Sequence, residues 1–473
     1  MPRNLRPAHA QSEVAAVILA AGRGTRMKSR TPKVLFDVCG RSMLAHAVDA
    51  ASGVNPSAIV IVVGHGREEV MNAFGDHNNK NLEFVTQDPP RGTGDAVKVA
   101  MKSVPASADV VLVTYADMPC LTPETLQKLI DKLPPGGVTL LTVTREEAHG
   151  FGRILRDPDG GFVGIREEKD CSPEERAIRE VNVGVYAFDR QALANALPRI
   201  QPNNAQREYY LTDAVLEIAK HGGLVRVVEI EDESESMGVN SLSELAMAKN
   251  IWQERILDYH LANGVAIEDP ATTIIDVDVE IGAGTRIYPF SVLRRGIKIG
   301  ENCEIGPFAH LRMDAVIDDT AKVGNFVEVK KSTLKRGVKA MHLAYIGDAI
   351  IGENANIGAG TITANYDGKN KWQTVVGARA FIGSGTVLVA PSSVGDDAIT
   401  GAGSIVTKKT IPAGEVWVGV PAKRFSSNDK TSGGAGSVKT KKTAATKSTI
   451  RKKLKVNTKL VAAAKSAKGK RGR

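Results

Sequence analysis

A glycine-rich turn follows the first strongly apolar run of the sequence. The run Val14–Leu19 has the unbroken hydrophobicity of a buried parallel strand, and it leads into residues 20–27, Ala-Ala-Gly-Arg-Gly-Thr-Arg-Met. Glycines let a backbone turn tightly and bring its N–H groups near a phosphate, and the Arg26 guanidinium can fork onto phosphate oxygens. The turn lacks the Gly-Lys-Ser/Thr of a Walker loop and the third glycine of a dinucleotide fingerprint. Together with Pro32 and Lys33 it predicts a phosphate-binding loop of another kind.

Asp117 ends a second apolar segment, residues 113–117. A carboxylate at a strand end can hold Mg²⁺, which prefers oxygen ligands and usually bridges to substrate phosphates. An aspartate that caps a helix is the simpler interpretation of Asp117 taken alone. The nearby phosphate loop favours a magnesium site.

His342 could serve a different reaction. A neutral histidine can take a proton as a general base at cellular pH. A lone histidine is more often structural, so the surrounding residues 341–348 must support the assignment.

The phosphate loop and Asp117 need a scaffold, and the first half of the chain alternates strands and helices. Ile59–Val63 and Val110–Thr114 have strand character, and Asp95–Met101 opens a helix. This succession predicts a Rossmann-like α/β domain with a mostly parallel sheet and helices on both faces. Ligands in such folds bind at the carboxyl ends of the strands.

The second half of the chain repeats every six residues. One unbroken phase of aliphatic residues runs through Ile275, Ile281, Ile287, Leu293, Ile299, Ile305, Leu311, Ile317, Val323 and Val329. The residue four places later is usually small, as at Thr285, Ser291, Cys303, Ala309, Ala315 and Ala321. A period of six fits neither a helix nor simple alternation, and it predicts a left-handed parallel β-helix of hexapeptide repeats.

The phase breaks twice, near residues 334–350 and 367–375. A solenoid tolerates insertions only as loops on its outer face, and such loops often carry function. We therefore expect both interruptions to be loops, the first of which holds Lys330, His342 and Tyr345.

Leu19–Met27 followed by Pro-Lys resembles the signature loop of sugar-nucleotide pyrophosphorylases. With the hexapeptide domain behind it, the chain is similar, from about Val14 to about Pro421, to the bifunctional N-acetylglucosamine-1-phosphate uridyltransferase/glucosamine-1-phosphate acetyltransferases. The resemblance implies a uridyltransferase domain at 12–240, a linker with an arm helix at 241–270, a β-helix acetyltransferase domain at 271–425 and a basic tail at 426–473. It implies synthesis of UDP-N-acetylglucosamine from UTP, glucosamine 1-phosphate and acetyl-coenzyme A (acetyl-CoA), with Mg²⁺ as cofactor, by a cytoplasmic homotrimer.

The resemblance also implies site residues. Catalysis is assigned to Arg26, Lys33 and, as the acetyl-transfer base, His342. UTP or UDP-N-acetylglucosamine is assigned to Leu19, Ala20, Ala21, Gly22, Lys33, Gln87, Gly92, Thr93, Gly152, Glu167, Asn182, Tyr210, Thr212 and Asn240. The metal is assigned to Asp117 and Asn240. Glucosamine 1-phosphate is assigned to Arg312, Lys330, Tyr345 and Asn356, and acetyl-CoA to Ala359, Asn365, Tyr366, Ser384 and Ala402, with Lys423 and Arg424 available for coenzyme phosphates. The resemblance assigns Gln87, Gly92 and Thr93 to the uracil. A glutamine amide offers both a donor and an acceptor, as a uracil edge requires.

Three positions depart from the family pattern. Ala116 and Arg207 stand where relatives usually have glycine, and Met313-Asp314 replaces Pro-Gly after the matched Arg312. The pattern over Leu242–Asn263 is helical and resembles the arm helix, with Ser241 and Glu244 as a capping box and Gly264 at its end.

Charge is divided unevenly along the chain. Residues 430–473 hold 15 Lys or Arg and no acidic residue, so removing these 15 charges from the net +9 leaves −6 for residues 1–429. The tail has few large apolar residues and is expected to stay disordered, as a solvated appendage or a weak contact for polyanions. The four cysteines are widely spaced, the N-terminus lacks a signal-peptide core, and no apolar run has the length of a membrane span.

Two alternatives stay open. The chain could be a single-activity pyrophosphorylase whose β-helix only supports oligomerisation, although His342, Lys330 and Tyr345 weigh against this. It could also be a nucleic-acid-associated protein with decayed enzyme domains, against which stands the set Gly22, Arg26, Lys33, Asp117 and Asn240.

Overall fold

A computed structural model describes residues 12–22, 24–74 and 81–425. The described residues up to Arg424 form one unit. The basic tail at 426–473 lies outside the described residues. None of the described helices combines the length and apolar character that a membrane span requires.

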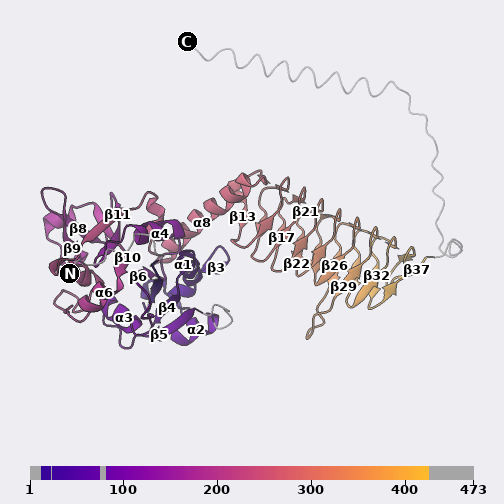
Figure 1. The fold of residues 1–473 in the computed structure, drawn as a ribbon. Helices are drawn as coiled ribbons and strands as arrows, with labels where there is room; N and C mark the ends of the chain where they lie inside the picture. Colours follow the sequence, from indigo (N-terminus) through magenta and orange to yellow (C-terminus); the bar gives the residue numbers. More distant parts are fainter. Residues whose placement is uncertain (1–11, 23, 75–80, 426–473) are drawn as a thin grey trace, which may run out of the picture. The chain divides into compact units, whose positions relative to one another are not determined.

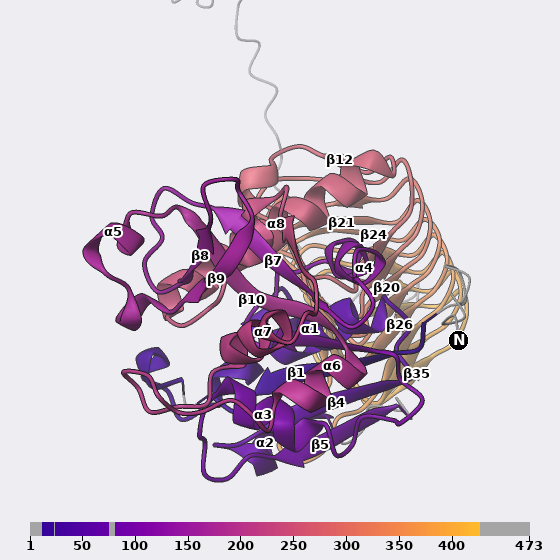
Figure 2. The ribbon, with the colours of Figure 1, turned by 60° about the vertical axis from the view of Figure 1, so that its left-hand side comes forward.

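The N-terminal half is built on one mixed sheet (Figures 1 and 2). Its strand order is β11-β7-β10-β6-β1-β4-β5, and a hairpin of β8 and β9 pairs with β10. Only β10 runs antiparallel to its neighbours β6 and β7 within that described order. The strands are β1 (Val14–Ala20), β4 (Ala58–Val63), β5 (Leu82–Thr86), β6 (Val110–Tyr115), β7 (Val138–Thr144), β8 (Gly152–Arg156), β9 (Phe162–Arg166), β10 (Glu180–Asp189) and β11 (Val225–Glu229).

Helices cover both faces of this sheet because its central strands are apolar on both sides. Along β1, Ala16 and Ile18 join one buried cluster with α1 (Met43–Ser52), α2 (Arg67–Phe74) and α4 (Pro123–Asp131). Ala15 and Val17 join the other cluster with α3 (Thr93–Ala100), α6 (Arg190–Ala196) and α7 (Leu211–Lys220). The predicted α/β domain and its mostly parallel sheet are confirmed.

Short elements complete this half. They are η1 (Thr25–Met27), η2 (Lys33–Leu35), β2 (Asp37–Val38), β3 (Arg41–Ser42), η3 (Glu168–Asp170), α5 (Pro173–Arg176) and η4 (Glu233–Ser236).

The predicted arm helix is α8 (Leu242–Ala262). Ser241 caps it by accepting from Glu244 N, while the Glu244 carboxylate accepts from Asn240 N and Ser241 Oγ. Gly264 follows the helix with φ +83°. That left-handed conformation favours glycine, as the sequence predicted for the C-terminal cap.

Residues 266–424 form a parallel β-helix, as predicted. The chain visits three sheets in turn, through η5 (Pro270–Thr272) in the first coil. Sheet 1 holds β12 (Ala266–Ile267), β15 (Arg286–Ile287), β18 (Glu304–Ile305), β21 (Lys322–Asn325), β24 (Lys339–His342), β27 (Asn356–Ile357), β30 (Phe381–Ile382), β33 (Ile399–Thr400), β36 (Val416–Val418) and β37 (Lys423–Arg424). Sheet 2 holds β13 (Ile274–Ile275), β16 (Val292–Leu293), β19 (His310–Leu311), β22 (Glu328–Lys330), β25 (Tyr345–Gly347), β28 (Ile362–Ala364), β31 (Val387–Val389) and β34 (Ile405–Thr407). Sheet 3 holds β14 (Glu280–Ile281), β17 (Lys298–Ile299), β20 (Val316–Ile317), β23 (Thr333–Leu334), β26 (Ala349–Ile351), β29 (Thr374–Val376), β32 (Ser392–Val394) and β35 (Thr410–Ile411).

The repeated residues fill the interior of the solenoid. All ten aliphatic positions except Ile281, which is half-buried, are buried in one continuous core. The small residues four places later are buried too, because the turn there leaves no room for a larger side chain.

The first predicted interruption is not a loop. Val316 pairs with Thr333 and Thr333 pairs with Ile350, so each of these coils is seventeen residues long instead of eighteen. Two turns are each one residue shorter, and His342 stays within β24. The prediction of an outer loop at 334–350 was therefore wrong, because a lost residue shifts the phase just as an insertion does.

The second interruption is a loop, as expected. Ile350 pairs with Val375, which is 25 residues further on, and the additional residues lie between β28 and β29. Tyr366 and Lys371 bridge across this loop.

Candidate functional site

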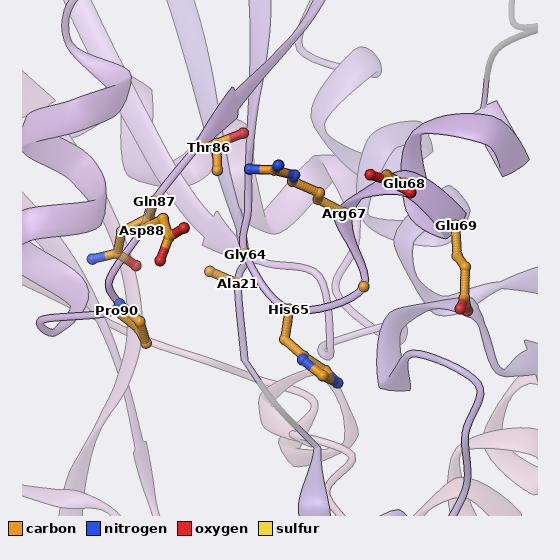
Figure 3. A pocket seen from close by; sticks show the side chains of 11 residues that line it. Ala21, Gly64, His65, Arg67, Glu68, Glu69, Thr86, Gln87, Asp88 and Pro90 are labelled. Atoms are coloured by element: carbon orange, nitrogen blue, oxygen red, sulfur yellow. The ribbon is translucent and has the colours of Figure 1, made fainter.

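A cavity of about 440 Å³ opens at the carboxyl ends of β1 and β6. Eight of the residues predicted to bind UTP or UDP-N-acetylglucosamine line it, together with Asp117: Leu19, Ala20, Ala21, Gly22, Lys33, Gln87, Gly92 and Thr93. Arg26 is exposed on η1 and is not among the residues that line the cavity. An adjoining polar cavity of about 430 Å³ shares Ala21, Gln87 and Pro90 with the first and continues past His65 and Arg67 (Figure 3).

A second cavity of about 240 Å³ is lined by the residues predicted to bind the sugar. Gly152, Glu167, Asn182, Thr212 and Asn240 are among its lining residues, whereas the buried Tyr210 is not. The two cavities share a wall made of Thr93, Tyr115 and Asp117. Two ligands could therefore meet at Asp117.

Lys33 occupies the point between the two predicted metal ligands. Its buried ammonium donates to Asp117 Oδ2 at 2.5 Å and to Asn240 Oδ1 at 3.0 Å. A carboxylate and an amide oxygen thus converge on one cation, which is the donor set that Mg²⁺ accepts when water and phosphate supply its remaining ligands. Among the described residues no cluster of three His, Cys, Asp or Glu could hold a metal, and Mg²⁺ needs none. The residues fit a magnesium ion.

Two glycines of the site are required by close approach of other residues. A Cβ on Gly24 would lie 2.6 Å from Lys33 Cβ, so glycine lets the phosphate loop close on the lysine. A Cβ on Gly92 would lie 2.5 Å from Tyr209 O, and Gly92 has φ +112°. The loop before α7 therefore packs directly on the start of α3, where Gly94 N donates to Tyr209 O at 2.7 Å.

The sugar cavity has its own polar network. Thr212 Oγ1 donates to Glu167 Oε1 at 3.1 Å, and burial raises the pKa of the Glu167 carboxyl above its ordinary value. Asn182 Nδ2 donates to the Tyr186 hydroxyl at 2.7 Å. These groups can exchange hydrogen bonds with sugar hydroxyl and amide groups. Arg207 has φ +55°, a left-handed conformation that favours glycine, the residue that the resemblance leads one to expect there.

Tyr115 is a lining residue of both cavities that the sequence did not single out. Burial, followed by the charges of Glu167 and Asp117, raises the pKa of its phenol well above the ordinary range. Tyr115 is the last residue of β6 and stands two residues before Asp117, and this position was the sequence signal that could have identified it.

Four of the predicted acetyl-transfer residues, His342, Ala359, Ser384 and Ala402, lie along one corner of the β-helix, between sheets 1 and 2. Each coil places there a residue with left-handed backbone, φ +51° to +74°: Phe290, Phe308, Phe326, Leu343, Gly360, Gly385 and Gly403. Directly before them stand Pro289, Pro307, Asn325, His342, Ala359, Ser384 and Ala402. Backbone hydrogen bonds connect successive coils, as from Gly360 N to His342 O and from Gly385 N to Ala359 O. We call this row the His342 corner.

The His342 corner changes character at His342. Before it, the left-handed position carries exposed phenylalanines, and after it the position carries glycines. This row of turns, each with a glycine, offers an open backbone surface on which a long ligand can lie. The predicted coenzyme contacts Ala359, Ser384 and Ala402 all belong to that part, and Asn356 lies on β27 beside the strand of His342.

Three cationic side chains lie close together, one sheet away from the His342 corner. Lys330 ends β22, and the charge of Lys371, then burial and Arg312, hold the pKa of the Lys330 ammonium below its ordinary value. Arg312 Nη1 is paired with Glu328 at 2.7 Å. Lys371 lies in the inserted loop and was missed because a loop lysine carries no pattern. Such a cluster suits a phosphate group.

The remaining predicted residues frame this cluster. Tyr345 starts β25 and its ring lies over Gly347. Asn365 donates to the Asp348 carboxylate, and Tyr366 OH donates to Gly368 O within the inserted loop. Lys423 and Arg424 are exposed on β37, and Arg424 pairs with Glu415 at 3.2 Å. These two residues are not part of the cation cluster.

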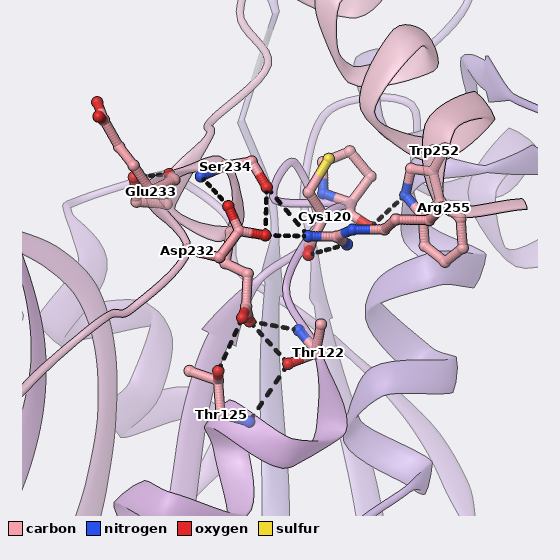
Figure 4. Close-up of polar contacts among 11 residues, drawn as sticks. Cys120, Thr122, Thr125, Asp232, Glu233, Ser234, Trp252 and Arg255 are labelled. Atoms are coloured by element: carbon pink, nitrogen blue, oxygen red, sulfur yellow. Dashed lines mark hydrogen bonds and ion pairs between the residues drawn. The ribbon is translucent and has the colours of Figure 1, made fainter. Parts of the chain in front are cut away.

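Helix α8 holds the two segments that carry Asp117 and Asn240 (Figure 4). Trp252 Nε1 donates to Pro119 O at 2.8 Å, and Arg255 Nη1 donates to Cys120 O at 2.7 Å. Arg255 Nη2 also reaches Asp232 and Ser234, both at 3.0 Å, just before the Asn240 segment. The arm helix therefore holds the segments that lead from Asp117 and into Asn240, the two predicted metal ligands.

We expect Arg255→Met to lower the affinity for Mn²⁺, a probe for Mg²⁺ measured by electron paramagnetic resonance with UTP present, by about tenfold. The substitution keeps the apolar stem but removes the donors that position the Asp117 and Asn240 segments. Arg156→Met, which removes the pair with Glu180 on the sheet surface, is the matched control and should leave the affinity unchanged. Equal affinities in the Arg255 and Arg156 variants would contradict the positioning role.

Comparison with known proteins agrees with this arrangement. Residues 16–229 match the family of MobA-like NTP transferase domains, and residues 278–312 match the bacterial transferase hexapeptide family. The bifunctional protein GlmU of Mycolicibacterium gilvum is 42% identical over an alignment of 470 residues, covering 87% of this chain and 91% of that protein. The GlmU proteins of Heliobacterium modesticaldum and Mycobacterium bovis are 42% and 38% identical, covering 85% and 87% of this chain and 94% and 91% of their own lengths. The chain therefore belongs to the family of bifunctional GlmU proteins, with a nucleotidyltransferase domain followed by a hexapeptide acetyltransferase domain.

Proposed function

We propose that the β-helix transfers acetyl from acetyl-CoA to glucosamine 1-phosphate and that the N-terminal domain then transfers UMP from UTP to N-acetylglucosamine 1-phosphate, releasing pyrophosphate. The observation that carries the proposal is the meeting of two cavities at Asp117, one lined by the phosphate loop and one by sugar-type polar groups. UTP and acetyl-CoA are cytoplasmic metabolites, and all four cysteines are free and buried, which supports a cytoplasmic protein.

In uridylyl transfer, a phosphate oxygen of the sugar phosphate attacks the α-phosphorus of UTP in line, and pyrophosphate leaves. Backbone N–H groups of the phosphate loop and the ammonium of Lys33 bind and orient the charged phosphates, with Arg26 available at the rim. Thr212 and Glu167 orient the sugar. Asp117 and Asn240 would hold Mg²⁺, which would supply positive charge for the phosphates when bound. Positioning and charge neutralisation account for catalysis, and no covalent enzyme intermediate is needed.

In acetyl transfer, the amine of glucosamine 1-phosphate attacks the thioester carbonyl, and the coenzyme thiol leaves. His342 is exposed at the corner and takes the proton from the attacking nitrogen. Lys330 and Lys371, with Arg312 and Tyr345, bind the phosphate, and Asn356 binds the sugar. The glycine-flanked turns beyond His342 support the coenzyme.

The two reactions should be separable by mutation because their residues lie on different elements. His342→Ala should reduce acetyl transfer by at least about a hundredfold and leave uridylyl transfer near normal. Asp117→Ala should do the reverse. His221→Ala, at the exposed end of α7, is a control that should affect neither half-reaction, each assayed on purified protein. Loss of both activities in one well-folded variant would show that the two-site proposal is wrong.

A homotrimer is the second part of the proposal. Phe290, Phe308 and Phe326 stack at centroid distances of 4.8 and 4.9 Å, yet they are 50%, 42% and 56% exposed. A bulky residue with left-handed backbone is strained, so three such exposed phenylalanines in a row favour a covered surface in the assembly. The row ends beside His342, to whose imidazole no described side chain hydrogen-bonds. A neighbouring subunit near Ser384 or Ala402 would complete the acetyl site.

Phe308→Asp should convert the trimer into smaller species in sedimentation velocity and lower acetyl transfer by about tenfold or more, while uridylyl transfer persists. A charge buried at a subunit contact without a partner is strongly unfavourable. Val163→Asp is the matched control, because Val163 is also an exposed apolar residue but lies on β9. A wild-type monomer with full acetyl transfer, or a Phe308→Asp trimer, would contradict the shared site.

The basic tail is proposed as a polyanion contact that neither reaction requires. Truncation after Asn428 should leave both half-reactions within about a few-fold of the intact chain and abolish salt-sensitive retention on heparin, because the 15 basic charges are removed. Kinetic assays and heparin chromatography of the two proteins check this. Collapse of acetyl transfer on truncation would show that the tail reaches the coenzyme site.

A further inference from the structure

The amide of Gln87 is fixed in one orientation by two neighbours. Gln87 follows β5, is 4% exposed, and lies at the wall shared by two cavities (Figure 3). Its Nε2 donates to Gly92 O at 3.0 Å and to Asp95 Oδ2 at 2.9 Å. A carbonyl and a carboxylate can only accept hydrogen bonds, so the group that faces them has to be the NH₂.

This orientation limits what Gln87 can offer to a ligand. Both N–H groups are already used, and no described residue donates to Oε1. Gln87 therefore acts toward a ligand as an acceptor. The sequence suggested that its amide offers a ligand both a donor and an acceptor, and the structure leaves the acceptor. Uracil carries an N–H at ring position 3, whereas cytosine has a bare acceptor nitrogen there.

Asp95 lies in the first turn of α3, and its carboxylate is largely buried. Arg91 Nε stands 3.8 Å from the same Oδ2. The Tyr209 backbone packs closely on Gly92, whose carbonyl is the other acceptor for the Gln87 amide. The hydrogen bonds to Gly92 O and to Asp95 Oδ2 both oppose an inverted Gln87 amide. Removing Asp95 removes one of these two bonds.

We propose that Asp95 is a positioning residue that fixes the Gln87 amide with its oxygen toward the base and so makes the nucleotide site selective for uracil over cytosine. The proposal rests on the proposed function, in which Gln87 contacts the uracil. Asp95 itself touches no substrate and acts through Gln87.

The test compares kcat/KM for UTP and for CTP, measured by pyrophosphate release with N-acetylglucosamine 1-phosphate. Asp95→Leu, which removes the acceptor, should lower the UTP-to-CTP ratio by about tenfold, the effect of one buried hydrogen bond. Asp95→Asn keeps an acceptor of the same shape and should retain the ratio within about threefold. Should the leucine variant fold poorly, Asp95→Ala provides a second test, because alanine favours helix formation.

Asp131→Leu is the matched control, because Asp131 Oδ1 accepts from Gln127 Nε2 at 2.8 Å on the exposed side of α4. Its ratio should equal that of the wild type, and acetyl transfer should be unchanged in every variant. An unchanged ratio in both Asp95→Leu and Asp95→Ala, with a lowered ratio in Gln87→Leu, would overturn the role of Asp95. An unchanged ratio in Gln87→Leu would instead overturn the assignment of Gln87 to the uracil.

Discussion

The buried ammonium of Lys33 joins three parts of the chain that are far apart in sequence. Asp117 is 84 residues away and Asn240 is 207 residues away, yet both oxygens meet the same nitrogen. A buried cation needs such partners, and two oxygens with no cation between them would repel each other. The phosphate loop, the carboxyl end of β6 and the start of α8 must therefore come together, and the two cavities form where they do. The pairing holds the Asp117 carboxylate and the neutral Asn240 amide oxygen around one cation.

The β-helix depends on a different constraint, the left-handed residue at every turn of the His342 corner. Glycine meets this requirement without strain, but phenylalanine does so only where stacking or a covered surface offsets the cost. One backbone geometry thus serves two purposes along a single row. The phenylalanines form a surface suited to a subunit, and the glycines form a surface suited to a ligand. His342 stands between the two.

Periodicity made the architecture predictable, because a six-residue repeat and alternating βα segments have few alternative folds. It could not show that the break near residue 334 is a pair of shortened turns, since phase alone does not distinguish a lost residue from an inserted loop. Motif matching placed Gln87, Thr93, Glu167 and Thr212 at the two cavities, where the structure also has them. It missed Tyr115 and Lys371, which are recognised only by what lies beside them in space, and the phosphate contact predicted for Arg26 stays a prediction. The donor state of Gln87 depends on Asp95, a contact that no pattern encodes.

Contacts of α8 have a consequence for how this protein can be divided into fragments. Trp252 packs on His46, and Arg255 and Trp252 bind the segment after Asp117, so the helix is firmly attached to the N-terminal domain. Its buried Ile256 and Leu257 also belong to the core that continues into the β-helix. The first coil is attached as well, since Val277 N donates to Cys39 O and Arg41 pairs with Asp278. An expression fragment that stops at residue 240 would expose the apolar surface under the helix. It would also lose the hydrogen bonds from α8 to the segments next to Asp117 and Asn240. A fragment intended for ligand screening or crystallisation should therefore extend through α8 and the first β-helix coil, and the acetyltransferase half should be expected to need its own new N-terminal cap.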